Sequence, residues 1–300
     1  MRLAGAIDIG GTMCKVGIVA ADGTIVRRSS IPTSAHGDPM PLVNSLTSAL
    51  RPMLDAAAAE GESVSGMGVS VAGFLDGPRE AMIDNANLPA LHAFPLRHAL
   101  EERLALECRL EVDSNAAVVA EYRYGAGRGA RRLLGVTVGT GLGGGVMIDG
   151  ELLRFTGACA GDLGHIILDP AGRRCTCGAR GCFEAMVCAS ALSERAGGRA
   201  IADVIGKARQ GEEESLHALA MTGWWLGLGL ASLSPIFAPE IIVVGGGIGA
   251  AGELLMDPVR ASYRIHANTQ LRERVQIAGS LFQGWEGMVG AGSLVLEPLD

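Results

Sequence analysis

The chain has 300 residues, 48% of them hydrophobic, which is enough for a large core and excludes a disordered chain. Its formal net charge of −7 and its pI near 5.4 disfavour nucleic acid as the main partner. The 44 glycines gather in short runs, which indicates turns that approach a ligand or another backbone closely.

The chain opens with three predicted strands. An apolar run over Leu3–Ile9 predicts the first, and Val16–Ala20 and Ile25–Arg28 predict the next two. Asp22-Gly23 predicts a tight hairpin turn between the second strand and the third. The N-terminal segment therefore begins as a β-meander.

The turn between the first two strands reads Asp8-Ile-Gly10-Gly11-Thr12. Its glycines allow backbone N–H groups to face an anion, and the Thr12 hydroxyl adds a donor. Asp8 can hold Mg²⁺ through water, and Lys15 can support phosphates. The alternative is an ordinary hairpin with a solvated lysine.

An α/β segment follows, with Asp113 at the end of one of its strands. The predicted elements are a helix over Pro39–Glu60, a strand over Met67–Val71, a helix over His92–Glu107, a strand over Leu110–Val112 and a helix over Ala116–Tyr124. Asp113 is either a general base at a carboxyl strand end or the N-cap of the next helix. Asn87 is either a turn former or a ligand to a hydroxyl.

A second glycine run, Gly139–Gly145, follows a strand predicted over Leu133–Val138. Its letters match the dinucleotide pattern, but Val146–Ile148 reads as a strand where that pattern needs a helix. A second phosphate turn fits better. Since the two hairpin turns resemble each other, we expect a duplicated fold with a cleft between its halves.

The third glycine run, Gly245–Gly247, follows a strand predicted over Ile241–Val244 and precedes a helix near Glu253. This context suits a nucleotide, although no acid is placed for the ribose of a dinucleotide. The uncharged segment Met221–Pro239 is predicted to be a buried helix rather than a membrane span.

Three cysteines in one glycine-rich loop, Cys175, Cys177 and Cys182, follow His165. Three thiolates and one imidazole suit tetrahedral Zn²⁺, which would be structural with all four positions filled. Small buried thiols are the alternative. The other cysteines show no disulfide framework, and no signal peptide is recognisable, so we expect a cytoplasmic protein.

These motifs resemble those of the ROK family of bacterial sugar kinases, within the actin/hexokinase-like superfamily. The resemblance runs from Asp8 to about Leu296, and the matching segments are Asp8–Thr12, Gly139–Gly145, Gly161–His165, Cys175–Glu184 and Val244–Gly247. It implies an α/β, ribonuclease H-like duplicated fold with two lobes around a cleft. One lobe would be residues 1–113, completed by a helix over about 286–300, and the other would be residues 114–285 with the zinc knuckle.

The resemblance also implies ATP- and Mg²⁺-dependent phosphorylation of a hexose or N-acetylhexosamine, usually at the 6-hydroxyl. Asp113 would accept the hydroxyl proton, and His165 would bind both zinc and sugar. The implied substrate-binding residues are Gly73, Asn87, Asp113, Asp162, His165 and Glu184. The implied cofactor-binding residues are Asp8, Gly10, Gly11, Thr12, Lys15, Gly139, Thr140, Gly141, Gly246 and Gly247.

Two positions depart from the family pattern: Val112 replaces an asparagine and Asp162 replaces a glutamate. Both face the sugar in relatives, so we expect a changed preference among hydroxyls. The departures also favour the alternative of a non-catalytic, sugar-binding sensor, whereas the retained Asp8, Thr12 and Asp113 speak against it. An oxidoreductase and a zinc-knuckle nucleic-acid binder are disfavoured.

The partners implied are a sugar and, by analogy with relatives, a second copy of the chain in a homodimer. We expect neither a nucleic-acid nor a membrane partner. Because the sequence opens directly with the first predicted strand, we also expect no DNA-binding module of the kind that the family's repressors carry.

Overall fold

The computed structural model describes residues 1–34, 36–84, 88–154 and 162–299. The chain divides into two compact units. The first contains Met1–Tyr124, Glu151–Gly161 and Trp285–Asp300, and the second contains Gly125–Gly150 and Asp162–Gly284. The first unit thus extends past Asp113, where the sequence analysis placed a boundary, because helix α3 (Asp113–Tyr124) packs against helix α10 (Glu286–Leu296).

The first unit is built on a five-stranded sheet with the order β3-β2-β1-β4-β7. These strands are β1 (Arg2–Ile9), β2 (Met13–Ala20), β3 (Ile25–Pro32), β4 (Ser63–Val71) and β7 (Cys108–Val112). The first three are antiparallel, and β4 and β7 continue parallel to β1. The short strands β5 (Phe74–Leu75) and β6 (Met82–Asp84) form a separate hairpin.

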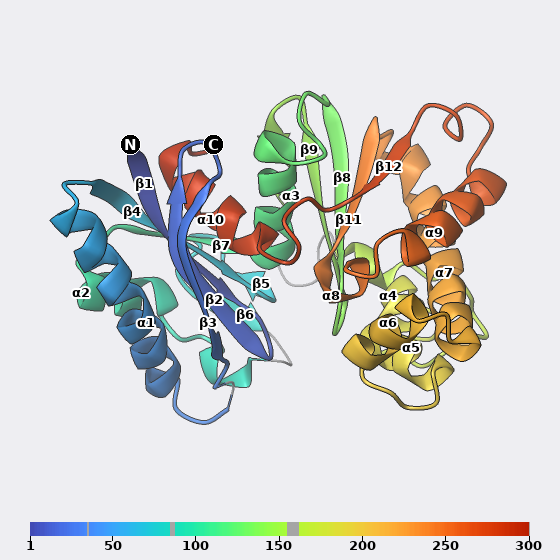
Figure 1. Ribbon diagram of the computed structural model, residues 1–300, viewed down its shortest axis with the longest axis horizontal. Coiled ribbons are helices and arrows are strands. Elements are labelled where there is room, and N and C mark those ends of the chain that lie inside the picture. Colours follow the sequence, from blue (N-terminus) through green and yellow to red (C-terminus); the bar gives the residue numbers. More distant parts are fainter. Residues whose placement is uncertain (35, 85–87, 155–161, 300) are drawn as a thin grey trace. The chain divides into compact units, whose positions relative to one another are not determined.

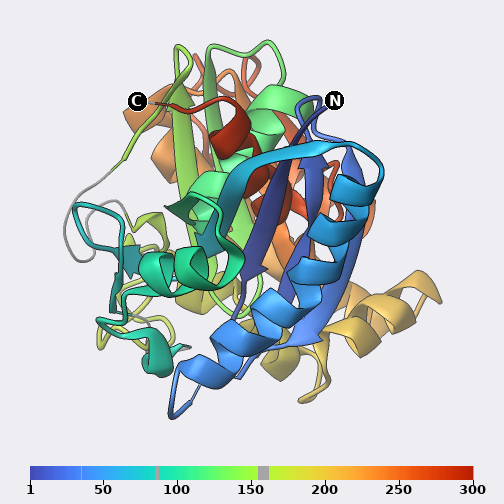
Figure 2. The ribbon, with the colours of Figure 1, turned by 90° about the vertical axis from the view of Figure 1, so that its left-hand side faces the viewer.

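Helices cover both faces of this sheet (Figures 1 and 2). Helices α1 (Met40–Ala59) and α2 (Leu96–Leu104), with the short 3₁₀ turn η1 (Pro89–Leu91), lie on one face, and α3 and α10 lie on the other. Helix α10 packs closely through glycine. A Cβ on Gly68 of β4 would lie 1.8 Å from the carbonyl oxygen of Ala291, and one on Gly290 would lie 1.7 Å from that of Ala116. No larger residue fits at either contact.

The second unit repeats the topology of the first. Its sheet has the order β10-β9-β8-β11-β12, with β8 and β9 antiparallel and with β11 and β12 parallel to β8. The strands are β8 (Arg132–Val138), β9 (Leu142–Ile148), β10 (Glu151–Leu152), β11 (Ile241–Gly245) and β12 (Gln276–Gly279). The predicted duplication of topology is confirmed.

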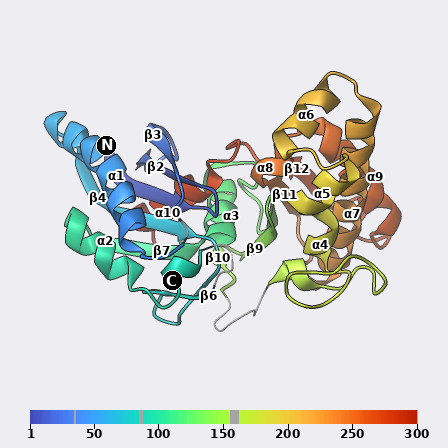
Figure 3. The ribbon, with the colours of Figure 1, turned by 90° about the horizontal axis from the view of Figure 1, so that it is seen from below.

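In the second unit, four helices pack against the long helix α7 (Glu213–Phe237), and Figure 3 shows them around it. They are α4 (Phe183–Val187), α5 (Ala189–Arg195), α6 (Ile201–Arg209) and α9 (Glu253–His266), and the unit also contains η2 (Leu163–His165) and α8 (Gly246–Gly249). Helix α7 is long and apolar enough to cross a membrane, but 56% of its apolar window is buried within the structure. This burial confirms the predicted core helix.

Several predicted boundaries were wrong. Helix α2 starts at Leu96 instead of His92, because Ala93 has a left-handed backbone and Pro95 precedes the first helical residue. The second glycine run is a turn only up to Gly141, since β9 begins at Leu142. The third run already starts helix α8 at Gly246.

Candidate functional site

The first glycine turn connects β1 to β2 and is held in place by Thr33, the residue that follows β3. Gly10 donates its N–H to the carbonyl oxygen of Met13 at 3.2 Å, and the Thr33 hydroxyl donates to the Gly10 carbonyl at 2.8 Å. The Thr33 N–H also donates to the carbonyl of Thr12 at 3.0 Å. Gly11 and Thr12 stay exposed within this fixed frame, so their donors can meet an anion.

Asp8 is the penultimate residue of β1 and is fixed by three neighbours in the first unit. Ser70 Oγ donates to its Oδ1 at 2.7 Å, and Lys15 Nζ lies 3.3 Å from its Oδ2. The N-terminal turn of α10 also meets it, because a Cβ on Gly287 would lie 2.7 Å from Asp8 Oδ1. A helix N-terminus stabilises a carboxylate. Asp8 is therefore a pre-positioned anion that can hold a hydrated cation.

Asp113 stands where β7 becomes α3 and is the first residue of that helix. Its Oδ1 accepts the N–H of Ser114 at 2.7 Å, so it also serves the helix start. Burial, and after it the nearby Asp8 charge, raise the pKa of its carboxyl from 3.8 to about 6, against smaller lowering effects of the Ser114 N–H bond and of Lys15. A carboxylate with a pKa close to neutral suits a general base.

The second glycine turn is held by Glu184 and by the Gly246 turn. Gly139 N–H donates to the carbonyl of Gly141 at 2.9 Å, and Glu184 Oε2 accepts the N–H of Leu142 at 2.9 Å. A Cβ on Gly141 would lie 2.5 Å from that same carboxylate oxygen. Gly246, with φ of 82°, packs onto the end of β8, where a Cβ would lie 2.5 Å from the carbonyl of Val138.

The four predicted zinc ligands come together in the second unit. The ligand atoms of His165, Cys175, Cys177 and Cys182 all lie within 4.8 Å of one another. Cys175 Sγ is 3.6 Å from His165 Nδ1, and the sulfurs of Cys177 and Cys182 are 3.6 Å apart. A tetrahedron with Zn–S bonds of about 2.3 Å has edges of about 3.8 Å. The donor set therefore fits zinc in number, type and spacing.

The surroundings of this cluster also fit a metal. His165 Nε2 lies 3.3 Å from Asp162 Oδ2, which is how a carboxylate orients a metal-binding imidazole. Burial raises the pKa of the Cys182 thiol to about 12, so its thiolate needs a cation beside it. Gly181, with φ of 68°, allows the loop to close against the carbonyl of Asp169.

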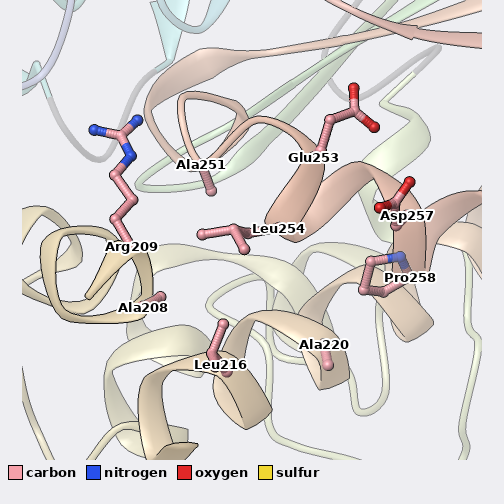
Figure 4. Close-up of a pocket in the computed structure, with 9 residues that line it drawn as sticks. All are labelled: Ala208, Arg209, Leu216, Ala220, Ala251, Glu253, Leu254, Asp257 and Pro258. Carbon is pink, nitrogen blue, oxygen red and sulfur yellow. The ribbon is translucent and has the colours of Figure 1, made fainter. Parts of the chain in front are cut away.

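A pocket of about 660 Å³ opens within the second unit, between α6, α7 and α9 (Figure 4). Its lining residues are Ala208, Arg209, Leu216, Ala220, Ala251, Glu253, Leu254, Asp257 and Pro258. Small and aliphatic side chains form the walls, while Arg209 stands on one side and Glu253 and Asp257 on another. None of these residues was singled out from the sequence. The available signal was the position of Ala251 and Glu253 just after the third glycine run.

The predicted site residues therefore fall into two sets, one in each unit. The first unit holds Asp8, Gly10, Gly11, Thr12, Lys15, Gly73 and Asp113, and the second holds Gly139, Thr140, Gly141, Asp162, His165, Cys175, Cys177, Cys182, Glu184, Gly246 and Gly247. Asn87 lies outside the described residues. Sequence reasoning missed Ser70, a hydroxyl inside an apolar strand, and the bond from Leu142 to Glu184.

Comparison with known proteins places this geometry in a family. The model of the ROK family matches residues 4–297. A glucokinase of Streptomyces coelicolor is 32% identical over 321 aligned positions, covering 99% of this chain and 99% of the relative. An N-acetylmannosamine kinase of Escherichia coli is 34% identical over 251 positions, covering 82% and 83%.

A solved structure agrees with these relatives. The ROK family glucokinase of Streptomyces griseus, in complex with glucose and AMPPNP, has a TM-score of 0.86 and 31% identity, covering 97% of this chain and 98% of that one. The actin/hexokinase-like fold expected from the motifs is thereby confirmed. The chain belongs to the ROK family.

Proposed function

We propose that this protein is an ATP-dependent sugar kinase that phosphorylates the 6-hydroxyl of a hexose or an N-acetylhexosamine. The observation that carries the proposal is Asp113, a carboxylate with its pKa raised to about 6 at the end of a parallel strand. Family relatives that match nearly the whole chain are named glucokinases, which agrees with this assignment.

In the first unit, Asp113 accepts the proton of the attacking sugar hydroxyl. The reaction depends mainly on positioning and on neutralising charge at the transferred phosphoryl group, so this base gives limited but necessary help. Gly11 and Thr12 donate to the phosphate tail from a turn that Gly10 anchors. Asp8 holds Mg²⁺ through water, and Lys15 beside it adds positive charge.

In the second unit, the turn of Gly139, Thr140 and Gly141 binds the phosphates, and Gly246 and Gly247 lie against the adenosine. Ala251, four residues after Gly247 in sequence, lines the pocket between α6, α7 and α9, and this pocket has the volume of a small-ligand site. We propose that it receives the base of the nucleotide. A bulky substitution at Leu254 should then raise KM for ATP and leave KM for the sugar unchanged.

Sugar hydroxyls are assigned to Gly73, Asn87, Asp162, His165 and Glu184. Three of these side chains already have partners that narrow their roles. His165 has Nδ1 beside Cys175, so it can meet the sugar only through the Nε2 that it shares with Asp162. Asp162 engages His165 Nε2, and Glu184 accepts the N–H of Leu142, so each offers the sugar only its remaining lone pairs. This supports a substrate preference different from that of relatives with a longer side chain at position 162.

A structural Zn²⁺ held by His165, Cys175, Cys177 and Cys182 completes the proposal. The ion would fix the loop that leads into α4, where Glu184 stands in the first turn. Because four protein ligands fill the tetrahedron, the ion supplies stability and no open position for chemistry.

We also propose a cytoplasmic homodimer that binds neither nucleic acid nor membrane. Trp224 of α7 and Ile265 of α9 are exposed on two helices that pack together, which supports association through that surface. Light scattering on the purified protein distinguishes a dimer from a monomer.

The alternative is a sugar-binding sensor without turnover, favoured by Val112 and Asp162. A coupled assay of ADP release across glucose, mannose and their N-acetylated amines, with calorimetry for sugar binding, separates the two. A kinase releases ADP with at least one sugar. A sugar that binds tightly without any ADP release supports the sensor.

A further inference from the structure

A row of polar side chains crosses the sheet of the first unit. Strand pairing places Lys15 of β2 opposite Asp8 of β1, Asp8 opposite Ser70 of β4, and Ser70 opposite Glu111 of β7. Residues opposite one another in neighbouring strands point to the same face. Glu111 thus lies two strands away from Asp8, in the same row and two residues before Asp113.

Glu111 is a buried carboxylate, with 2% of its side chain exposed, that none of the proposed roles uses. Four donors surround it. Oε1 accepts the N–H of Val112 at 2.9 Å and the side-chain amide of Asn115 at 3.0 Å. Oε2 pairs with Arg79 and, at 3.1 Å, with Arg154 Nε. Charge-assisted bonds of this kind are the strong ones, and breaking a buried pair is costly.

These donors come from three separate parts of the first unit. Val112 and Asn115 stand on either side of Asp113 and so fix the junction of β7 and α3. Arg79 belongs to the loop between β5 and β6, and its φ of 59° is rare for a non-glycine residue. Arg154 follows β10. One carboxylate therefore ties the strand–helix junction to two other chain segments.

The duplicated sheet shows that the fold does not need this acid. Strand β12 occupies in the second sheet the place that β7 has in the first. Its penultimate residue is Ala278, where β7 has Glu111. Nothing in the strand topology explains a charge at this position, so a task specific to the first unit is the better explanation.

We propose that Glu111, clamped by Arg79 and Arg154, is a positioning residue that holds Asp113 in its reactive orientation. The inference rests on the proposed function, in which Asp113 is the base. A carboxylate that swings through a small angle no longer meets the substrate hydroxyl, and such misplacement lowers turnover while substrates still bind.

The central test is a double-mutant cycle with Glu111→Gln and Asp113→Asn, measured as kcat with sugar and ATP saturating. We expect Glu111→Gln alone to lower kcat by about 10- to 100-fold and to change KM for ATP less than about threefold. In the Asp113→Asn background it should have no further effect, since the base it positions is gone. A general structural defect would lower kcat again in that background.

Glu60→Gln is the matched control, because Glu60 pairs with Arg27 on the exposed surface of the same unit. It should leave kcat unchanged. If Glu111→Gln fails to fold, the double variant Glu111→Gln with Arg154→Gln takes its place, because it removes one of the two guanidinium charges that lose their carboxylate and so restores the net charge of the wild-type cluster. Wild-type kcat in a folded Glu111 variant overturns the inference alone, whereas an active Asp113→Asn overturns the assignment of the base.

Discussion

The two units share one strand order but end their strands with different chemistry. In the first unit, Lys15, Asp8 and Glu111 place charges along one row of the sheet. In the second unit, the corresponding strand ends carry Gly139–Gly141 and Gly245–Gly247. Charges in fixed positions need buried partners, whereas glycines expose backbone N–H groups without any side chain. Both units therefore carry a glycine turn between their first two strands, and the first unit adds a row of charged side chains across its sheet.

Substitution of Asp113 tests this division most strongly. Asp113→Asn removes the proposed proton acceptor but keeps the size of the side chain and an acceptor for the Ser114 N–H. We expect kcat to fall by about 10²- to 10⁴-fold, with sugar affinity within a few-fold of the wild type. Steady-state kinetics and calorimetry measure both. Turnover close to the wild type would remove Asp113 from the role of base.

Removal of the zinc ion proposed for the second unit should have the next largest effect. Three thiols and an imidazole that lie within 4.8 Å of one another hold the loop before α4, and metal binding at such sites contributes directly to folding. A strong chelator should lower both the melting temperature and activity, and added Zn²⁺ should restore them. Full activity in protein shown to be metal-free by elemental analysis would disprove the structural role.

The glycine turn of the second unit offers a sharper test of backbone donors. Gly141→Ala would bring a Cβ to within 2.5 Å of Glu184 Oε2, which must move and release Leu142 N–H. We expect KM for ATP to rise by about tenfold, the scale of a lost charge-assisted bond. Gly206→Ala, in open space on α6, is the control and should bind ATP normally. Equal KM values for ATP in the two variants would argue against the proposal that this turn binds the phosphates.

The smallest expected effects are those of pH. Because burial raises the pKa of Asp113 to about 6, the base is protonated below that pH, and kcat should fall as pH decreases through about 6. The free energy of unfolding should change with pH in the opposite direction to kcat. The folded state prefers the protonated acid, so ionisation above the unfolded pKa of 3.8 destabilises the fold, by at most about 3 kcal/mol at pH 8.

Chemical denaturation can measure this pH dependence of the free energy of unfolding. Asp113→Asn cannot ionise and should therefore be more stable than the wild type at pH 8 and no more stable at pH 4. A variant that is less stable at both values would show that burial does not disfavour the Asp113 charge.

Local patterns predicted the elements that local physics determines. Leucines spaced along one face define α1, and glycine runs after apolar strands identify the turns at Gly11 and Gly141. The cysteine spacing predicted that Cys175, Cys177 and Cys182 come together with His165. Each of these signals lies within a short window of sequence, where periodicity and turn chemistry decide the structure.

What could not be predicted depends on partners far away in sequence. Ser70 and Glu111 belong to the polar row only because β4 pairs with β1 and β7 pairs with β4, each in one register, and no local pattern states those registers. Strand β12 is four residues long and mostly half-buried, so it has no clear alternation. The pocket of α6, α7 and α9 arises from packing that connects distant helices.

Helix α10 has a consequence for how the protein is made. It belongs to the first unit, contacts β1, β2, β4 and α3, and yet it is encoded after the whole second unit. During synthesis on the ribosome, the sheet of the first unit emerges early and keeps the apolar face that α10 covers exposed until translation is almost complete. The half whose strands are made first is thus the last to become a finished folding unit, and nascent chains are exposed to chaperones and proteases throughout that delay.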